Sequence, residues 1–222
     1  MYRIGIDVGG TFTDVTLLDA ETGEYKNYKL SSTPHDQSVA IAAGAREAMA
    51  LYDVKPEEIN YFGHGTTVAT NMIIERKGAK TALITTKGFT DILEIARQTR
   101  PSLYNIQADK PDALIRRALR RGVEERVCAD GSVLRPIDRE EVISVLRSLK
   151  EEGVEALAVC FLFSYLNPSH EKLVEECILE VWPEVYYSIS STILPEFREF
   201  DRLSTTVINS YLGPKMKQYI DN

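Results

Sequence analysis

The sequence predicts an α/β protein whose mixed sheet opens with antiparallel strands and is flanked by helices. Two observations carry this prediction. Three strand-like segments begin the chain at 2–8, 11–18 and 24–30, and turn-forming residues at 19–23 separate the last two. Helix-like and strand-like segments then alternate over most of the chain, which is the order of a layered α/β sheet.

The first helix is expected after Pro34 and the acidic Asp36, because apolar residues recur at helical spacing from Val39 to Leu51. A short strand at 61–65, a helix at 67–77 ended by Gly78, a strand at 80–85 and a short helix at 89–95 follow. Residues 98–138 are expected to be irregular, with a hairpin near Asp130-Gly131. The basic residues within 116–121 are interpreted as a solvated helix end.

Regular alternation resumes after this middle region. We expect a helix at 139–152 that ends at Gly153, a buried strand at 156–163, and a helix at 169–181 with Pro168 near its first turn. A strand at 185–190 and a long helix at 201–220 complete the chain, and the helix is expected to be interrupted near Gly213-Pro214. Alternating charges at 196–202 are interpreted as an ion-pair cluster that positions this helix.

Composition excludes several classes of protein. The 222 residues are 44% hydrophobic and 27% charged, as in soluble globular proteins, and the net charge of −7 argues against general nucleic-acid binding. No apolar run has membrane-spanning length and no signal peptide opens the chain. Cys128, Cys160 and Cys177 are far apart without a Cys-x-x-Cys pair, which predicts free thiols in the cytoplasm. Cys160 lies in an apolar run and is expected in the core.

The most informative segment is 4–14, Ile-Gly-Ile-Asp7-Val-Gly9-Gly10-Thr11-Phe-Thr13-Asp14. Glycines allow close approach of the backbone to an anion, and amides in such a turn form an anion-binding concavity. Threonine hydroxyls add donors, and Asp7 could hold hydrated Mg²⁺. The pattern indicates a site for nucleotide phosphate and magnesium. Two glycines between strands are equally an ordinary hairpin turn, and the two interpretations are compatible.

The order of elements, with this turn between the first two strands, resembles one lobe of an actin-like ATPase, which has a ribonuclease H-like fold. Such proteins bind nucleotide between two lobes. The adenosine pocket and second phosphate loop of the other lobe are not found in this sequence, so the chain is expected to be an N-terminal fragment. The resemblance implies a first subdomain at 1–96, an irregular insertion with substrate-loop candidates at 97–137, and an α/β continuation with a linker helix at 138–222.

Four further segments make the resemblance specific. They are Gly63-His64-Gly65-Thr66-Thr67-Val-Ala-Thr-Asn71, the run from Thr81 to Asp91, Arg97-Gln98-Thr-Arg100-Pro-Ser-Leu-Tyr, and the run from Pro195 to Thr206. Together with residues 7–14 they resemble the N-terminal region of the hydantoinase A/5-oxoprolinase family. The resemblance covers essentially the whole chain in order.

The resemblance implies an enzyme that uses ATP and Mg²⁺ on a cyclic amide, such as 5-oxoproline or a hydantoin. Phosphorylation of the amide oxygen would precede ring opening. A ketone carboxylase of the same family is an alternative, because it would share the phosphate turn. A non-catalytic actin-like nucleotide sensor is another alternative. The implied partners are the small-molecule substrate and a hydantoinase B-type subunit or domain. The last helix, with Val207, Ile208, Tyr211 and Leu212, is expected to expose apolar surface that could form a homodimer.

Site residues carried over from the resemblance fall into three groups. Asp7 would hold magnesium through water, and Gly9, Gly10, Thr11 and Thr13 would bind the phosphates; Asp14 would either bind metal or have a structural role. His64 would be catalytic, with Thr66 and Thr67 touching substrate, or it would be a histidine hydrogen-bonded at a tight turn, with a threonine capping the next helix. Arg97, Gln98 and Arg100 would bind a substrate carboxylate, or form surface salt bridges.

Overall fold

The computed structural model describes residues 1–33 and 36–221, so the predicted role of Pro34 at a helix start lies outside the described residues. The chain forms two compact units, Met1–Lys77 with Lys215–Asn222, and Gly78–Pro214. We describe each unit by itself. The three-segment division expected from the sequence stays a prediction.

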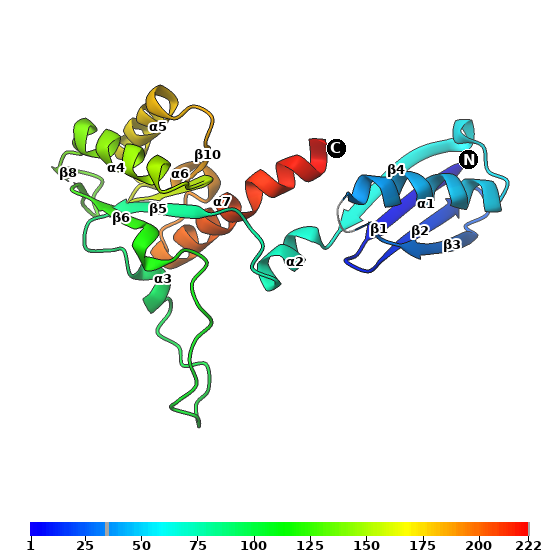
Figure 1. Cartoon of the computed structure of the whole chain (residues 1–222), viewed down its shortest axis with the longest axis horizontal. Helices are drawn as coiled ribbons and strands as arrows, with labels where there is room; N and C mark the ends of the chain where they lie inside the picture. The colour runs from blue at the N-terminus through cyan, green and yellow to red at the C-terminus, as the bar shows by residue number, and fades with distance from the viewer. Residues whose placement is uncertain (34–35, 222) are drawn as a thin grey trace. The chain divides into compact units, whose positions relative to one another are not determined.

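The first unit is built on a mixed sheet of four strands (Figure 1). Its elements are β1 (Tyr2–Val8), β2 (Phe12–Asp19), β3 (Tyr25–Ser31), α1 (Gln37–Leu51), a 3₁₀ turn (Pro56–Glu58), β4 (Ile59–Thr66) and α2 (Val68–Ile74). The strand order is β3-β2-β1-β4, with β2 antiparallel to β1 and β3, and β4 parallel to β1. The predicted antiparallel opening of an α/β fold is therefore confirmed.

Helix α1 covers one face of this sheet. Side chains alternate between faces along a strand, and Ile4, Ile6 and Val8 of β1 are buried in a core that includes Ala48 of the helix. The helix approaches the sheet closely at Gly44, where an added Cβ would lie 2.8 Å from Leu30 Cδ2. The opposite face carries the alternate residues of β1, including Asp7.

The second unit holds a sheet of four parallel strands in the order β10-β9-β5-β6. The strands are β5 (Thr81–Thr86), β6 (Arg120–Val123), β9 (Ala156–Cys160) and β10 (Tyr186–Ile189), and a separate hairpin pairs β7 (Arg126–Val127) with β8 (Val133–Arg135). The helices are α3 (Ile92–Ile95), η2 (Arg117–Leu119, 3₁₀), α4 (Arg139–Glu151), α5 (Ser169–Val181), α6 (Ser190–Ile193) and α7 (Glu199–Asp221).

Every residue of β5 and β9 is buried, which requires cover on both faces of the sheet. Helices α4 and α5 pack together on one face, and α7 runs along the other (Figure 1). The hairpin near Asp130-Gly131 is confirmed, and Gly131 has the positive φ of 83° that favours glycine in a turn. Cys160 is buried as predicted, and burial raises the pKa of its thiol to about 11.

The interpretation of residues 116–121 as a solvated helix end is wrong for Arg120 and Arg121, whereas Arg116 and Arg117 are exposed at a 3₁₀ helix. Residues Arg120–Val123 form β6, parallel to β5, and the Arg120 side chain is buried. Its Nε donates to the Ile115 carbonyl at 3.0 Å and its guanidinium pairs with Glu94 at 2.9 Å. Backbone pairing and these two partners offset the cost of burying a guanidinium, and this tertiary effect cannot be read from charge alone.

Two expectations for the last helix are also wrong. Helix α7 is continuous through Pro214. Val207 and Tyr211 are only 1% and 6% exposed, because they pack in the second unit, and of the four named residues only Ile208 is exposed. The premise for a homodimer through this surface is therefore lost. In the described part of the chain, no helix is both long and apolar enough to cross a membrane.

The charges at 196–202 form a structural cluster only in part. Asp201 pairs with Arg97. Arg202, however, is fully buried and donates to the carbonyl of Phe161 at 3.0 Å and to that of Glu196. Its guanidinium also lies over the Tyr165 ring at 5.4 Å. Arg202 therefore fixes the start of α7 through backbone carbonyls and an aromatic ring rather than through a carboxylate.

Candidate functional site

The turn between β1 and β2 is held in one shape by backbone bonds and by Ser32. The Gly9 amide donates to the Phe12 carbonyl at 3.0 Å, and the Ser32 amide donates to the Thr11 carbonyl at 2.9 Å. The Ser32 hydroxyl donates to the Gly9 carbonyl at 2.8 Å. An added Cβ at Gly9 would lie 2.9 Å from the Phe12 carbonyl oxygen, so only glycine fits there without a shift.

The tip of this turn presents free donors. Gly10 and Thr11 are exposed, and their amides donate to no other group among the residues that the structure describes. An added Cβ at Gly10 would lie 3.2 Å from Asn71 Nδ2, so the tip lies beside the first turns of α2. Free amides in a tight turn, next to a side-chain amide, are suited to bind an anion.

The start of α2 is joined to the end of β1. The Thr67 amide donates to the Val8 carbonyl at 3.3 Å, and Thr66 Oγ1 accepts from the Val68 amide at 3.1 Å. The N-cap residue Thr67 makes no side-chain cap bond, so the Thr66 hydroxyl satisfies the first helical amide instead. Asn71 Nδ2 donates to Thr67 Oγ1 at 3.4 Å rather than to backbone. These bonds place Thr66, Thr67 and Asn71 beside the Gly9-Gly10 turn.

Asp7 lies on the open face of the sheet, close to this turn. It pairs in register with Asp14 of β2 and with Gly65 of β4, and an added Cβ at Gly65 would lie 3.6 Å from Asp7 Oδ1. Asp14 forms an ion pair with Lys29 at 3.0 Å. The Asp7 carboxylate, in contrast, has no hydrogen bond or ion pair with any described residue, and it is exposed. Asp7 is thus free to hold a hydrated cation, whereas Asp14 has its own counter-ion.

Thr13 does not belong to this open face. Its side chain is fully buried, and its hydroxyl lies 2.9 Å from the hydroxyl of Ser32, which in turn binds the Gly9 carbonyl. The alternation of β2 turns Thr13 away from the face that carries Asp14. The Thr13 hydroxyl is positioned to brace the hairpin from behind, and a phosphate-binding role for Thr13 stays a prediction.

His64 is not brought together with Asp7. It pairs in register with Ile6, whose side chain faces α1, whereas Asp7 pairs with Gly65 and faces the opposite side of the sheet. His64 Nε2 lies 2.7 Å from the hydroxyl of Tyr219, and the two rings are 5.7 Å apart at their centroids. This contact agrees with the alternative of a hydrogen-bonded histidine. A catalytic role for His64 stays a prediction.

Arg97, Gln98 and Arg100 belong to the second unit. Arg97 forms an ion pair with Asp201, so it already has a carboxylate partner. Gln98 and Arg100 are exposed, and Gln98 has a φ of 56°, in the left-handed region. No contact in this loop separates a substrate-binding role from a structural one, and the substrate-binding role stays a prediction.

Sequence reasoning missed three residues that shape the site. Ser32 holds the turn, Lys29 neutralises Asp14, and Tyr219 contacts His64. Lys29 could have been found, because it lies directly opposite Asp14 in a hairpin of this register. Tyr219 lies 155 positions from His64 in the sequence, and no local pattern connects the two.

The fold and this turn define an α/β protein with a glycine hairpin that presents free amides beside an exposed carboxylate. The chain belongs to the hydantoinase/oxoprolinase family, since the model of that family's N-terminal region matches residues 3–182. The family expected from the sequence is thereby confirmed.

Characterised relatives cover several reactions. The chain is 38% identical to caprolactamase subunit alpha of Pseudomonas jessenii, over 99% of this chain and 32% of that protein. It is 37% identical to the acetophenone carboxylase gamma subunit of Aromatoleum aromaticum, over 98% and 32% respectively. It is 33% identical to 5-oxoprolinase 1 of Arabidopsis thaliana, over 98% and 19%.

A solved structure supports the fold. The crystal structure of the ATP-dependent caprolactamase from Pseudomonas jessenii matches with a TM-score of 0.89 at 36% identity, covering 99% of this chain and 33% of that one. The chain therefore spans about a third of the length of caprolactamase, and about a fifth of the plant 5-oxoprolinase.

Proposed function

We propose that the chain is the nucleotide-binding N-terminal part of an ATP-dependent enzyme that opens cyclic amides, of the 5-oxoprolinase or hydantoinase type. The observation that carries this proposal is the Gly9-Gly10 turn, whose tip amides are free and lie beside the exposed carboxylate of Asp7. Relatives named as an ATP-dependent caprolactamase and a 5-oxoprolinase support it, because both names describe cyclic amides as substrates.

In this proposal the amides of Gly10 and Thr11, with the Thr11 hydroxyl, bind the β- and γ-phosphate oxygens of ATP. Asp7 holds Mg²⁺ through water. The donor set fits such an ion, since Mg²⁺ keeps most of its waters and takes one or two carboxylates together with phosphate oxygens. No group of three or more potential metal-binding side chains occurs in the described residues, so water and phosphate would supply the remaining ligands.

The chemistry explains why ATP is needed. An amide carbon is a poor electrophile with a poor leaving group. The amide oxygen of the substrate would accept the γ-phosphoryl group, and water would attack the activated carbon. The C–N bond would then break to leave an acyl phosphate, which a second water hydrolyses to the ring-opened acid and inorganic phosphate. Positioning and electrostatic stabilisation of the phosphates make up most of the catalysis of such a transfer, which is the task proposed for Asp7, Gly10 and Thr11.

A ketone carboxylase is the second candidate. The acetophenone carboxylase gamma subunit is nearly as similar to this chain as caprolactamase is. The phosphate turn would serve both reactions, provided that the ketone oxygen, like the amide oxygen, is activated with ATP. Both relatives are named as subunits, which supports a hydantoinase B-type partner for the chain.

Assay of the assembled enzyme with ATP separates the two candidates. The enzyme is incubated with ATP and one substrate at a time: 5-oxoproline, a hydantoin, caprolactam, or acetophenone with bicarbonate. Phosphate release is compared with and without that substrate. The proposal expects phosphate release that depends on a cyclic amide and yields the ring-opened acid. Release that depends only on ketone and bicarbonate would replace it with the carboxylase.

A further inference from the structure

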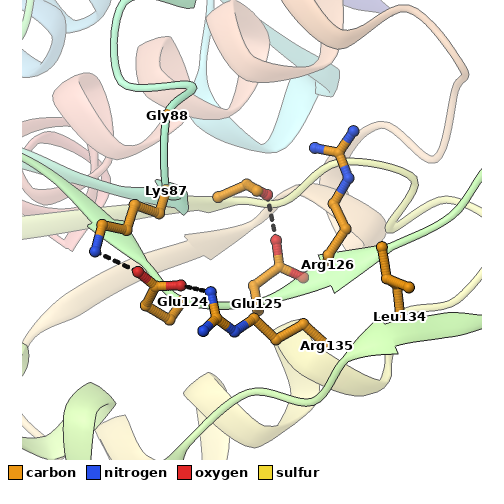
Figure 2. Close-up of a pocket in the computed structure, with 8 residues that line it drawn as sticks. Lys87, Gly88, Glu124, Glu125, Arg126, Leu134 and Arg135 are labelled. Carbon is orange, nitrogen blue, oxygen red and sulfur yellow. Dashed lines mark hydrogen bonds and ion pairs between the residues drawn. The ribbon is translucent and has the colours of Figure 1, made fainter.

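A pocket of about 560 Å³ opens at the carboxyl edge of the parallel sheet in the second unit (Figure 2). It is lined by the residues that follow β5, from Thr86 to Gly88, by those that follow β6, from Glu124 to Arg126, and by β8. Ligands of open α/β sheets bind at the carboxyl ends of the strands. The volume suits a small organic molecule. This pocket is separate from the residues of the proposed nucleotide turn.

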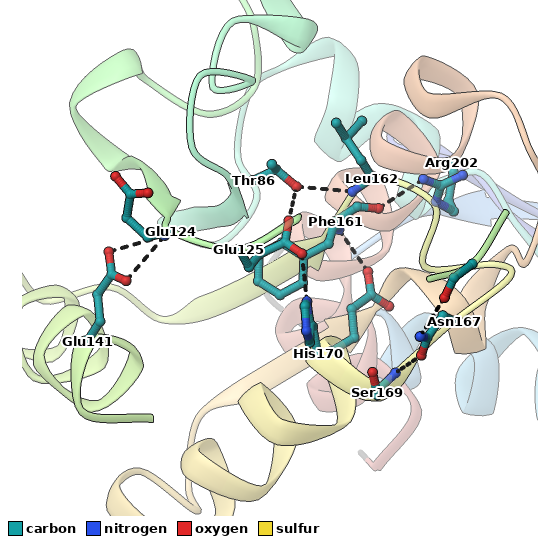
Figure 3. A network of polar contacts seen from close by, with 12 residues as sticks. Thr86, Glu124, Glu125, Glu141, Phe161, Leu162, Asn167, Ser169, His170 and Arg202 are labelled. Atoms are coloured by element: carbon teal, nitrogen blue, oxygen red, sulfur yellow. Dashed lines mark hydrogen bonds and ion pairs between the residues drawn. The ribbon is translucent and has the colours of Figure 1, made fainter. Parts of the chain in front are cut away.

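A buried hydrogen-bond network joins two of the lining residues, Thr86 and Glu125, to neighbouring segments (Figure 3). The Thr86 hydroxyl donates to Glu125 and accepts from the Leu162 amide at 3.1 Å, so it ties the ends of β5 and β9 to the segment after β6. The other carboxylate oxygen of Glu125 lies 2.7 Å from His170 Nδ1. Both oxygens are occupied and the Glu125 side chain is fully buried, and among the described residues this carboxylate makes no ion pair with the cations that line the pocket.

Among the residues that line the pocket, the cationic side chains outnumber the carboxylates. Lys87 and Arg135 both pair with Glu124, so one carboxylate serves two cations (Figure 2). Arg126 is half-buried and stacks on the Phe89 ring at 5.1 Å, and it has no carboxylate partner among the described residues. The ring contact restricts the guanidinium on one side and leaves its N–H groups to bind a planar anion. Leu134 adds an apolar wall.

We infer that this pocket binds a small organic carboxylate, with Arg126 as the residue that binds the carboxylate group and Lys87 and Arg135 as supporting charge. An arginine fork matches a carboxylate in bidentate geometry. The apolar surface of Leu134 and the volume of the pocket accommodate the organic part of the ligand, which a bare inorganic ion would leave unused.

The test is a titration of the ¹⁵N-labelled 222-residue chain at constant ionic strength. Sodium succinate is the probe, neutral succinamide is the control for charge, and sodium phosphate is the inorganic anion. We expect saturable shifts at the amides of Gly88 and Arg126 with succinate and none with succinamide. Arg126→Gln should weaken succinate binding about tenfold, since a charged hydrogen-bonded pair is lost. Arg147→Gln, on the exposed side of α4, should leave it unchanged.

Three results would overturn the inference. They are the absence of saturable succinate shifts around the pocket in the unaltered chain, equal succinate affinity in Arg126→Gln, and tighter binding of phosphate than of succinate at the same amides. The first result needs no variant, so it decides the question even if Arg126→Gln fails to fold. Loss of this site would leave the nucleotide turn of the first unit untested, so the two proposals fail separately.

Discussion

Asp7 and Asp14 face each other across two antiparallel strands, yet their surroundings differ. Asp14 has Lys29 at 3.0 Å, whereas Asp7 has no cation among the described residues. At the scale of single residues, this difference supports the proposal that Asp7 holds the metal and that Asp14 has a structural role.

Asp7→Asn should lower ATP-dependent turnover of the assembled enzyme by about 100-fold or more, because phosphoryl transfer depends on charge placed at the phosphates. Asp14→Asn is the matched control and should lower turnover only slightly, since it removes a surface ion pair. Steady-state phosphate release measures both. Equal losses in the two variants would remove the distinction between the carboxylates.

Substitutions of Thr11 and Thr13 should also differ in their effects. Thr11→Val removes an exposed hydroxyl at the turn and should weaken ATP affinity about tenfold with little change in stability. Thr13→Val removes the partner of the Ser32 hydroxyl in a buried site and should destabilise the chain by about 1 kcal/mol. Both variants keep the β-branched shape. Calorimetry for ATP and urea unfolding for stability check the pair, and a reversed pattern would show that Thr13 is the ligand.

At the scale of elements, hydrophobic periodicity predicted correctly those strands and helices whose buried residues follow a regular pattern. The opening strands and α5 follow alternating or helical patterns, and the structure has β1 at Tyr2–Val8 and α5 at Ser169–Val181 as predicted. Strand β6 was missed because Arg120 and Arg121 look solvent-exposed, whereas the sheet buries Arg120 with its partners. Which side chains of β2 and β4 are buried depends on their register with β1 and on the face of the sheet that α1 covers. Local pattern alone therefore could not predict that Thr13 is buried or that His64 lies in register with Ile6 rather than Asp7.

Gly213→Ala tests the packing of α7. In an exposed helix this change stabilises by about 1 kcal/mol. Here an added Cβ would lie 2.1 Å from the Tyr186 ring, so we expect destabilisation of about 1–3 kcal/mol by overpacking. Adding Tyr186→Leu should recover part of the loss, because the ring is removed. Thermal unfolding of the single and double variants measures this, and a single variant more stable than the parent would contradict the packing.

At the scale of the whole molecule, the two units have separate cores of unequal size. The first unit buries few large side chains under α1, whereas the second buries a parallel sheet between two helical layers. A smaller core supplies less hydrophobic stabilisation. The parts of the chain that carry the proposed nucleotide turn and the proposed carboxylate pocket are thus expected to differ in stability.

In urea the first unit should unfold before the second. Trp182, the only tryptophan, is buried in the second unit and reports its unfolding by fluorescence. Hydrogen exchange at β1 and β2 reports the first unit. Ile6→Ala, in the first core, should move only the earlier transition. Coincident transitions in the parent chain would show that the units unfold as one.

The central claim is that the tip of the Gly9-Gly10 turn binds the phosphates of ATP beside Asp7. A structure of the assembled enzyme with Mg²⁺ and a non-hydrolysable ATP analogue tests it most directly. The account predicts phosphate oxygens within hydrogen-bond reach of the Gly10 and Thr11 amides, and a magnesium-bound water on the Asp7 carboxylate. Phosphates bound elsewhere, with this turn in contact only with solvent, would contradict it.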